Sequence, residues 1–301
     1  MPSLRDIKRR ITSVKSTQKI TRAMKMVAAA KLRRAQEAIL RARPYAYEMR
    51  SLVDSLAQRA QQDAHPLLRR SAGGKVGVIV VTSDRGLCGG FNANIVNFTL
   101  RALQDRFAGR EVELTVVGRK GLETLRRRPV TICRSFIGQQ DKSPMRAASE
   151  VIDEIMKDFV ASGVDEIHCV YNEFKSAVQQ RVTLECLLPF ETEEVADKAQ
   201  TSTEEEAPGT DTPQETLIDY LYEPNQEEVF EALLTKHMYV QMHRILFESA
   251  ASEHGARMTA MDSATRNAGD VIDRLSLIYN RARQDAITKE LIEVISGAEA
   301  L

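Results

Sequence analysis

Residues 28–56 read AAAKLRRAQEAILRARPYAYEMRSLVDSL, and apolar residues recur in this stretch at alternating spacings of four and three. That spacing places them on one stripe of an α-helix, which is the pattern of a left-handed coiled coil. Pro44 lies inside the stretch and predicts a kink rather than a stop, because proline removes one amide donor and crowds the preceding turn. The stripe consists of Ala28, Leu32, Ala35, Ile39, Ala42, Ala46, Met49, Val53 and Leu56.

The same helix extends toward the N-terminus. Leu4, Ile7, Ile11 and Val14 follow helical spacing, and after a slip of phase the pattern resumes at Met24. Counted from Leu4 to Ala57, this helix would be roughly 80 Å long at 1.5 Å per residue. Because that length exceeds the diameter of a small domain, most of this helix must project.

The other end of the chain mirrors the first. We expect a helix over residues 226–301, and it pairs with residues 1–60 as an antiparallel coiled coil, a shaft, if the middle folds as one unit. The predicted seam of this second helix is Met261, Ala264, Ala268, Val271, Leu275, Ile278 and Ala282, and it resumes at Ile287, Leu291, Val294 and Ala298.

The middle of the chain, residues 74–190, alternates between strand and helix patterns. Strands are expected at 76–82, 113–117, 130–136 and 166–171, with helices at 93–107, 121–127 and 145–161 between them. Residues 181–188 alternate in polarity, as an edge or hairpin strand does. The fold class is therefore α/β with a long antiparallel coiled coil, and its centre is a small, Rossmann-like, mostly parallel α/β domain.

Residues 191–215 read ETEEVADKAQTSTEEEAPGTDTPQE. The segment is acidic, contains Pro, Gly and Thr, and has almost no bulky apolar residue. That composition predicts a mobile surface loop.

Charge is unevenly spread although the chain as a whole is neutral. Residues 1–50 hold fourteen Lys or Arg against Asp6, Glu37 and Glu48. Such a surface favours an acidic partner, either nucleic acid or an acidic protein, or is the solvated face of a long helix. Charge alone does not choose among these interpretations.

The sequence matches none of the catalytic motifs considered below. The Gly-rich stretch 83–92 follows a strand as a phosphate loop does, but it lacks both the GK[ST] ending and GxGxxG spacing, so we expect a tight turn with Asn92 as a helix cap. Four scattered cysteines and five histidines show no metal-ligand spacing. No cofactor, no metal and no direct nucleotide binding are expected. No apolar run of about twenty residues or secretory signal is seen.

Three blocks resemble the gamma subunit of the F-type ATP synthase of bacteria. Residues 15–31 contain TQKITRAMKMVAAAK, residues 82–92 read TSDRGLCGGFN, and residues 257–301 contain RMTAMDSATRNA and YNRARQDAITKELIEVISGAEAL. With LYEPN at 221–225, the resemblance spans nearly the whole chain.

The resemblance implies the central rotor stalk, a subunit that is not itself an enzyme. In that family the paired helices enter a ring of three alpha and three beta subunits, and the foot rests on the epsilon subunit and the membrane c-ring. Proton flow turns the ring and the stalk, and each beta subunit meets a different face of the stalk in turn, which cycles its nucleotide site for ATP synthesis or the reverse. Nucleotide chemistry belongs to the beta subunits.

The resemblance also assigns contacts by position. Arg283, Gln284 and Thr288 match the contact to the catch loop of beta, and Met24 and Lys25 match the contact to its acidic helix-turn-helix. Ile287, Leu291, Val294 and Ile295 match the apolar bearing tip, and Tyr220, Tyr222 and Glu223 match the foot that meets epsilon and the c-ring.

The implied location is the bacterial plasma membrane, peripheral and on its cytoplasmic side, because no transit peptide precedes the usual start of the family. Two other classes stay open on the residues alone. A chromosome-type protein with coiled-coil arms would explain the basic N-terminus but needs a Walker A motif, and a nucleotide-binding α/β enzyme needs a phosphate loop.

Overall fold

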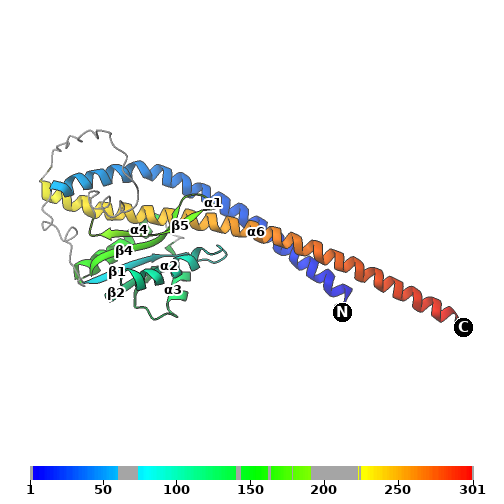
Figure 1. Cartoon of the computed structure of the whole chain (residues 1–301). Helices are drawn as coiled ribbons and strands as arrows, with labels where there is room; N and C mark the ends of the chain where they lie inside the picture. Colours follow the sequence, from blue (N-terminus) through cyan, green and yellow to red (C-terminus); the bar gives the residue numbers. More distant parts are fainter. Residues whose placement is uncertain are drawn as a thin grey trace, which may run out of the picture.

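The computed structural model describes residues 3–59, 74–139, 144–161, 164–177, 179–190, 223 and 225–299. Two long helices, α1 (Leu4–Arg59) and α6 (Gln226–Glu299), lie antiparallel and side by side, and an α/β domain packs against one end of the pair (Figure 1). The predicted fold class is confirmed. The predicted acidic loop at 191–215 lies outside the described residues.

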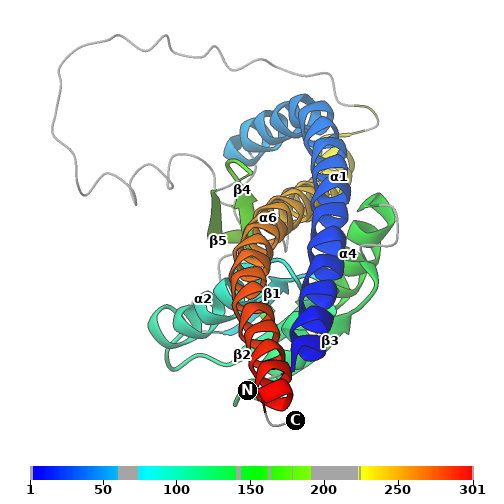
Figure 2. The ribbon, with the colours of Figure 1, turned by 90° about the vertical axis from the view of Figure 1, so that its right-hand side faces the viewer.

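The seam of α1 is buried as predicted. Leu32, Ile39, Met49, Val53 and Leu56 are all buried. The helix runs through Pro44 without a break, and it curves in its second half (Figure 2). The sequence therefore predicted both the contact stripe and the continuity of this helix.

The seam of α6 is confirmed at Met261 and Ala268, and Leu275 and Ala282 are half-buried, but the prediction is wrong at Val271 and Ile278. Val271 and Ile278 are 43% and 47% exposed, while Ile272 is half-buried. An α-helix has 3.6 residues per turn, so a strict seven-residue repeat drifts by about 20° per heptad. The contact stripe consequently moves by one residue along α6.

One mixed sheet forms the centre of the α/β domain. Its strand order is β3-β2-β1-β4-β5, and every neighbouring pair is parallel except β4 and β5, which form the predicted hairpin. The strands are β1 (Lys75–Val81), β2 (Val112–Val117), β3 (Ile132–Phe136), β4 (Val164–Phe174) and β5 (Gln180–Leu188).

Different elements cover the two faces of the sheet. Val78 and Val80 face one core with α2 (Phe91–Asp105) and α3 (Arg119–Leu125). Ile79 and Val81 face a second core built with α4 (Pro144–Ala161), α1 and α6. The shaft is thus part of the hydrophobic core of the domain, and Figure 2 shows α2 and α4 on opposite sides of the shaft axis.

Candidate partner-binding surfaces

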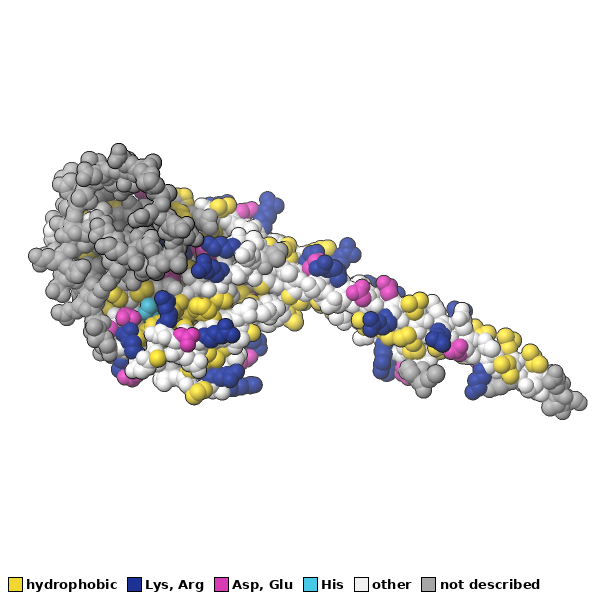
Figure 3. Space-filling model, viewed as in Figure 1, with side chains coloured by type: hydrophobic (Ala, Val, Ile, Leu, Met, Phe, Trp, Pro, Cys, Tyr) yellow, Lys and Arg dark blue, Asp and Glu magenta, His cyan; other side chains and the backbone are white. Residues whose placement is uncertain are grey.

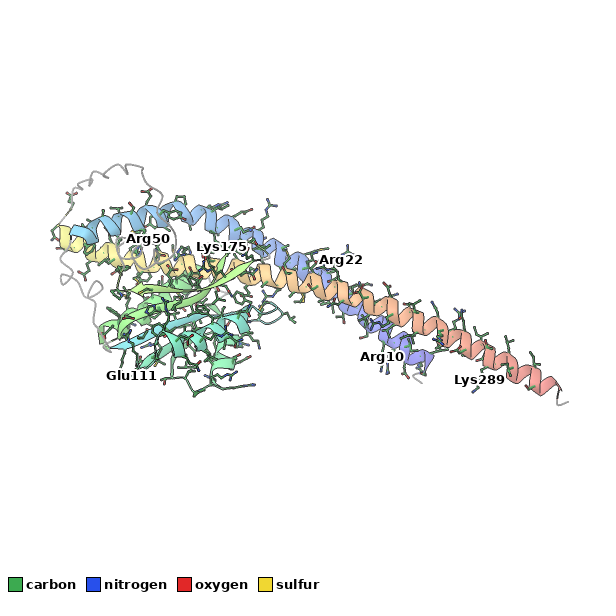
Figure 4. All side chains as sticks on the ribbon, viewed as in Figure 1. Arg10, Arg22, Arg50, Glu111, Lys175 and Lys289 are labelled. Carbon is green, nitrogen blue, oxygen red and sulfur yellow. The ribbon has the colours of Figure 1, made fainter. Side chains whose placement is uncertain are left out.

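The N-terminal half of α1 carries an exposed basic surface. Figure 4 shows Arg10 and Arg22 on the part of α1 that projects beyond the α/β domain. Exposed basic side chains on this part are Arg5, Lys8, Arg9, Arg10, Lys15, Lys19 and Arg22. Since these charges lie on one projecting segment, they generate a positive potential that suits an acidic partner.

Met24 and Lys25 are both half-buried at the base of this segment. The Lys25 ammonium forms an ion pair with the Asp262 carboxylate across the shaft, and Arg266 reaches the same carboxylate at 3.1 Å. The hydrogen bond from Lys25 holds the pKa of Asp262 below its usual value. Lys25 therefore has a partner within the chain, whereas Met24 faces a groove.

That groove, which we call the shaft–sheet groove, has a volume of about 550 Å³. It lies between α1, α6 and the carboxyl ends of β1 and β2, the edge at which open α/β sheets bind ligands. Its apolar side is formed by Ile20, Ala23, Met24, Val27, Ala28 and Leu87, and its polar side by Lys31, Asp84, Arg85, Glu253, His254 and Arg257.

The loop between β1 and α2 forms the mouth of the groove. The Asn92 side chain accepts a hydrogen bond from the Ser83 amide at 3.0 Å and donates to the Ser83 hydroxyl at 2.8 Å. Gly90, not Asn92, is the N-cap of α2, so the predicted cap is wrong. Because glycine occupies the cap position, Asn92 falls inside the first turn and holds the loop.

Leu87 is the strained residue of this loop. Its φ is 64°, a left-handed conformation that is uncommon for a residue with a β-carbon, and its side chain is 63% exposed. The Arg257 guanidinium fixes the loop from α6 by donating to the carbonyls of Arg85 and Gly86 at 3.4 and 3.2 Å. An apolar side chain is thus held toward solvent beside the groove.

Arg257 also pairs with Glu253 at 2.6 Å, and both side chains are largely buried. Next to them, burial, Arg257 and Lys31 lower the pKa of His254 to about 4. This histidine is therefore neutral at physiological pH. The spacing of Glu253 and Arg257 is visible in the sequence, but their burial against the loop is not.

The C-terminal part of α6 extends past the start of α1 (Figure 1). Arg283, Gln284 and Thr288 are exposed there, and the Thr288 hydroxyl donates to the Gln284 carbonyl at 3.0 Å. Ile287, Leu291 and Ile295 are exposed as well, and the side chain of Val294 lies outside the description. Figure 3 shows hydrophobic side chains interspersed with basic and acidic ones along this end.

Of the three residues predicted to form the foot, the structure describes one. Glu223 is exposed, while Tyr220 and Tyr222 lie outside the described residues. These three residues remain a prediction.

A partly buried ionic cluster was missed by sequence reasoning. Arg244 on α6 pairs with Glu185 on β5, donates to the Tyr171 hydroxyl at 3.2 Å, and reaches Glu248 at 3.4 Å. Burial disfavours the charged form of Arg244, but Glu185, Tyr171 and Glu248 together outweigh that effect and raise its pKa. Nothing in the local sequence signals this cluster, because Glu185 and Arg244 are far apart in the chain.

The described residues offer little reactive chemistry. Burial raises the pKa of the Cys88 and Cys169 thiols, so neither is an activated nucleophile. Within the described ranges, no group of three or more potential ligands is arranged to hold a metal ion. In the same part of the chain, no helix is both long and apolar enough to span a membrane.

Comparison with known sequences identifies a family that matches nearly the whole chain. A family model described as ATP synthase matches residues 3–301. The ATP synthase gamma chain of Geobacter metallireducens is 46% identical over 302 residues, covering 100% of this chain and 99% of the relative. The ATP synthase gamma chain of Anaeromyxobacter sp. strain K is 48% identical over 307 residues, and the match covers both chains fully.

Comparison with solved structures agrees with the sequences. A chain from the central stalk and c-ring of the Tetrahymena thermophila mitochondrial ATP synthase is similar with a TM-score of 0.58 and 28% identity, covering 81% of this chain and 99% of that one. A chain from the Euglena gracilis mitochondrial ATP synthase shares the fold, with a TM-score of 0.66 at 20% identity, covering 99% and 94%.

Proposed function

The chain belongs to the ATP synthase gamma-chain family, and from that membership we propose how its surfaces act in the complex. It is the central stalk subunit of a rotary ATP synthase. Its rotation couples proton flow through the membrane ring to the conformational cycle of the catalytic subunits. The shaft and the α/β domain share one hydrophobic core, so they turn as one body.

The observation that carries this proposal is the asymmetry of the shaft. Where α6 extends past α1, a single helix with exposed apolar and basic side chains replaces the pair (Figures 1 and 3). A ring around such a shaft meets a different surface at each third of a turn. The difference in contact free energy selects one conformation of each surrounding subunit at each position.

Arg283, Gln284 and Thr288 are proposed to contact the catch loop of the beta subunit. All three are exposed on the projecting part of α6. The Arg283 guanidinium suits a carboxylate, because charge-assisted hydrogen bonds are stronger than neutral ones. Ile287, Leu291, Val294 and Ile295 are proposed to turn in the apolar sleeve of the alpha and beta ring.

Met24 and Lys25 are proposed to meet the acidic helix-turn-helix of beta. Two features support this assignment: the exposed basic surface of α1 provides charge complementarity, and the shaft–sheet groove beside Met24 provides an apolar seat. Lys25 would then share its charge between Asp262 and the partner.

The foot is proposed to contact epsilon and the c-ring through Tyr220, Tyr222 and Glu223. We further propose that the subunit is non-catalytic, binds no cofactor, and leaves nucleotide chemistry to beta. Its proposed place is the cytoplasmic side of the bacterial plasma membrane, as a peripheral part of the complex.

The test is to place an affinity tag at Thr203 and purify the tagged chain from detergent-solubilised membranes. Alpha and beta subunits are expected to co-purify with ATPase activity. Changing Arg283 and Gln284 together to Ala is expected to abolish most of that activity. Asp273 and Arg274, exposed nearly three turns earlier on α6, provide the matched control as a double Ala variant.

The outcomes separate the claims. Activity that survives the Arg283 and Gln284 changes would keep the stalk but remove the catch contact. If the chain emerges alone or with nucleic acid, the proposed assembly is wrong.

A further inference from the structure

A second cavity, which we call the aromatic groove, lies on another side of the shaft. It has a volume of about 420 Å³ and is formed by α1, α4 and α6. None of its described lining residues also lines the shaft–sheet groove. Its volume falls in the range of small-molecule sites, which is about 300–1,000 Å³.

Four aromatic rings line this groove: Tyr45, Tyr239, His243 and Phe247. The His243 and Phe247 rings meet edge to face, with centroids 4.4 Å apart. The Tyr239 hydroxyl donates to the Asp153 carboxylate, which fixes the position of that ring. Burial lowers the pKa of His243, so its imidazole is neutral at physiological pH and acts as an aromatic wall.

The charged side chains that line the groove, among the described residues, are all basic. They are Lys236 and Arg244. Arg244 is already paired with Glu185 and Glu248 behind the wall, and Asp153 is bound to Tyr239. The Lys236 ammonium lies 6.0 Å from the centre of the Tyr45 ring, and it is the cation placed to meet a ligand.

The rim of the groove is open. Met145 on α4 is 69% exposed and Tyr45 on α1 is half-exposed, so flat aromatic bodies can enter between the two helices. Methionine adapts its shape to such bodies and packs favourably against aromatic rings. The remaining wall is aliphatic, formed by Ile39, Ala42, Ala46, Ala148 and Val240.

We infer that the aromatic groove binds a small planar aromatic anion, a carboxylate or sulfonate on a fused-ring or similar body, whose charge pairs with Lys236. The rings of Tyr45 and Phe247 would cover the aromatic body. This inference does not depend on the stalk function, because no residue of the groove belongs to the surfaces assigned to the beta subunit.

The test uses 2-naphthoate as the probe, titrated into the full chain and followed by ligand-observed NMR. We expect a single site with a dissociation constant on the order of 0.1–1 mM, as the size of the ligand implies. Two isosteric probes provide the charge control. Naphthalen-2-ylmethanol and the naphthalen-2-ylmethylammonium cation are expected to bind about tenfold more weakly, the neutral one for lack of an ion pair and the cation by repulsion.

Two surface variants locate the site without disturbing the core. Lys236→Gln removes the cation, and Met145→Glu places a carboxylate at the rim, so each is expected to weaken 2-naphthoate about fivefold or more. Lys31→Gln, which changes a lysine at the other groove, is expected to leave binding unchanged. The proposal is overturned if 2-naphthoate does not bind, if the cation binds equally well, or if Lys31→Gln weakens binding as much as Lys236→Gln does.

Discussion

The hydroxyl oxygens of Thr21 on α1 and Thr265 on α6 lie 2.7 Å apart inside the shaft. Each hydroxyl also contacts a carbonyl of its own helix, Thr21 at Gln18 and Thr265 at Met261. Because two hydroxyls hold two protons, only two of these three contacts are hydrogen bonds at one time. This polar layer, which the Gln18 amide joins by donating to the Thr265 carbonyl at 3.4 Å, fixes the register of the pair, as polar layers do in coiled coils.

Changing both threonines to valine is expected to alter the free energy of unfolding by less than about 1 kcal/mol, because replacing both partners by similar shapes is nearly neutral. A single Thr21→Val change should cost about 1 kcal/mol, since it leaves the part-buried Thr265 with fewer partners. Urea denaturation of the single and double variants measures the difference. A cost of the double change equal to the sum of the two single costs would show that the two hydroxyls are not coupled.

Lys25 forms an ion pair with Asp262 within the chain, and its second, proposed partner is the acidic segment of beta. If the partner matters, Lys25→Gln should lower the ATPase activity of the reconstituted complex several-fold, whereas Asp262→Asn should not, because it leaves the cation free for the partner. Activity assays at low and high salt check this, since screening weakens an exposed ion pair. Equal losses from both changes would place the role of Lys25 wholly inside the shaft.

Arg244 is one cation facing two carboxylates, Glu185 and Glu248. Arg244→Met is expected to destabilise the chain by about 3 kcal/mol, the lower end of the cost of breaking a buried pair, because it leaves the buried Glu248 and the half-buried Glu185 without their cation. Glu248→Gln should be neutral or stabilising: burial raises the pKa of Glu248, and one of its oxygens is buried without a hydrogen-bond partner. Chemical denaturation at pH 7 compares the two. A large loss from Glu248→Gln would contradict this account.

His237 makes stability depend on pH. Burial, with Arg50 and Arg244, lowers its pKa in the folded chain from 6.5 to about 4. Between those values the unfolded chain binds a proton that the folded chain does not, so stability falls as the pH drops from about 6.5 to about 4. Wild type should lose up to about 3 kcal/mol more than His237→Gln across that window. Urea midpoints at pH 7, 6, 5 and 4 test this, and parallel curves for both proteins would refute it.

The sequence predicted the shaft and the sheet because both follow local periodicity. The α1 stripe from Leu32 to Leu56 becomes buried as soon as a partner helix lies along it. The alternation of polarity in residues 181–188 matches strand β5. The predictions were wrong where a small difference in helical repeat adds up along a helix, or where another residue takes the expected position. Drift of the helical repeat moved the α6 seam from Val271 to Ile272, and Gly90 took the cap position that had been assigned to Asn92.

The grooves and the Arg244 cluster could not be predicted, since they depend on contacts between distant segments. The aromatic groove needs α1, α4 and α6 in register, and the left-handed conformation of Leu87 depends on the surrounding loop and on Arg257. Arg283 and Gln284 were assigned by resemblance, and their exposure on the projecting helix supports a contact without identifying its partner.

Substitution of Leu87 is expected to change the stability of the chain and its docking to partners in opposite directions. A left-handed residue with a β-carbon costs roughly 1–2 kcal/mol, so Leu87→Gly is expected to stabilise the isolated chain by a fraction of that amount, after the greater freedom of glycine in the unfolded state is counted. The same change removes an exposed apolar side chain from the mouth of the shaft–sheet groove. Reconstitution with alpha and beta should therefore need more of the variant to reach half-maximal ATPase activity.

Leu87→Asn is the matched control, because asparagine tolerates the left-handed conformation but is polar, so it should lose docking to the same degree. If the glycine variant is more stable and reconstitutes as well as wild type, the strain at Leu87 does not serve docking, and the groove must engage beta through Met24 and its neighbours on α1 alone.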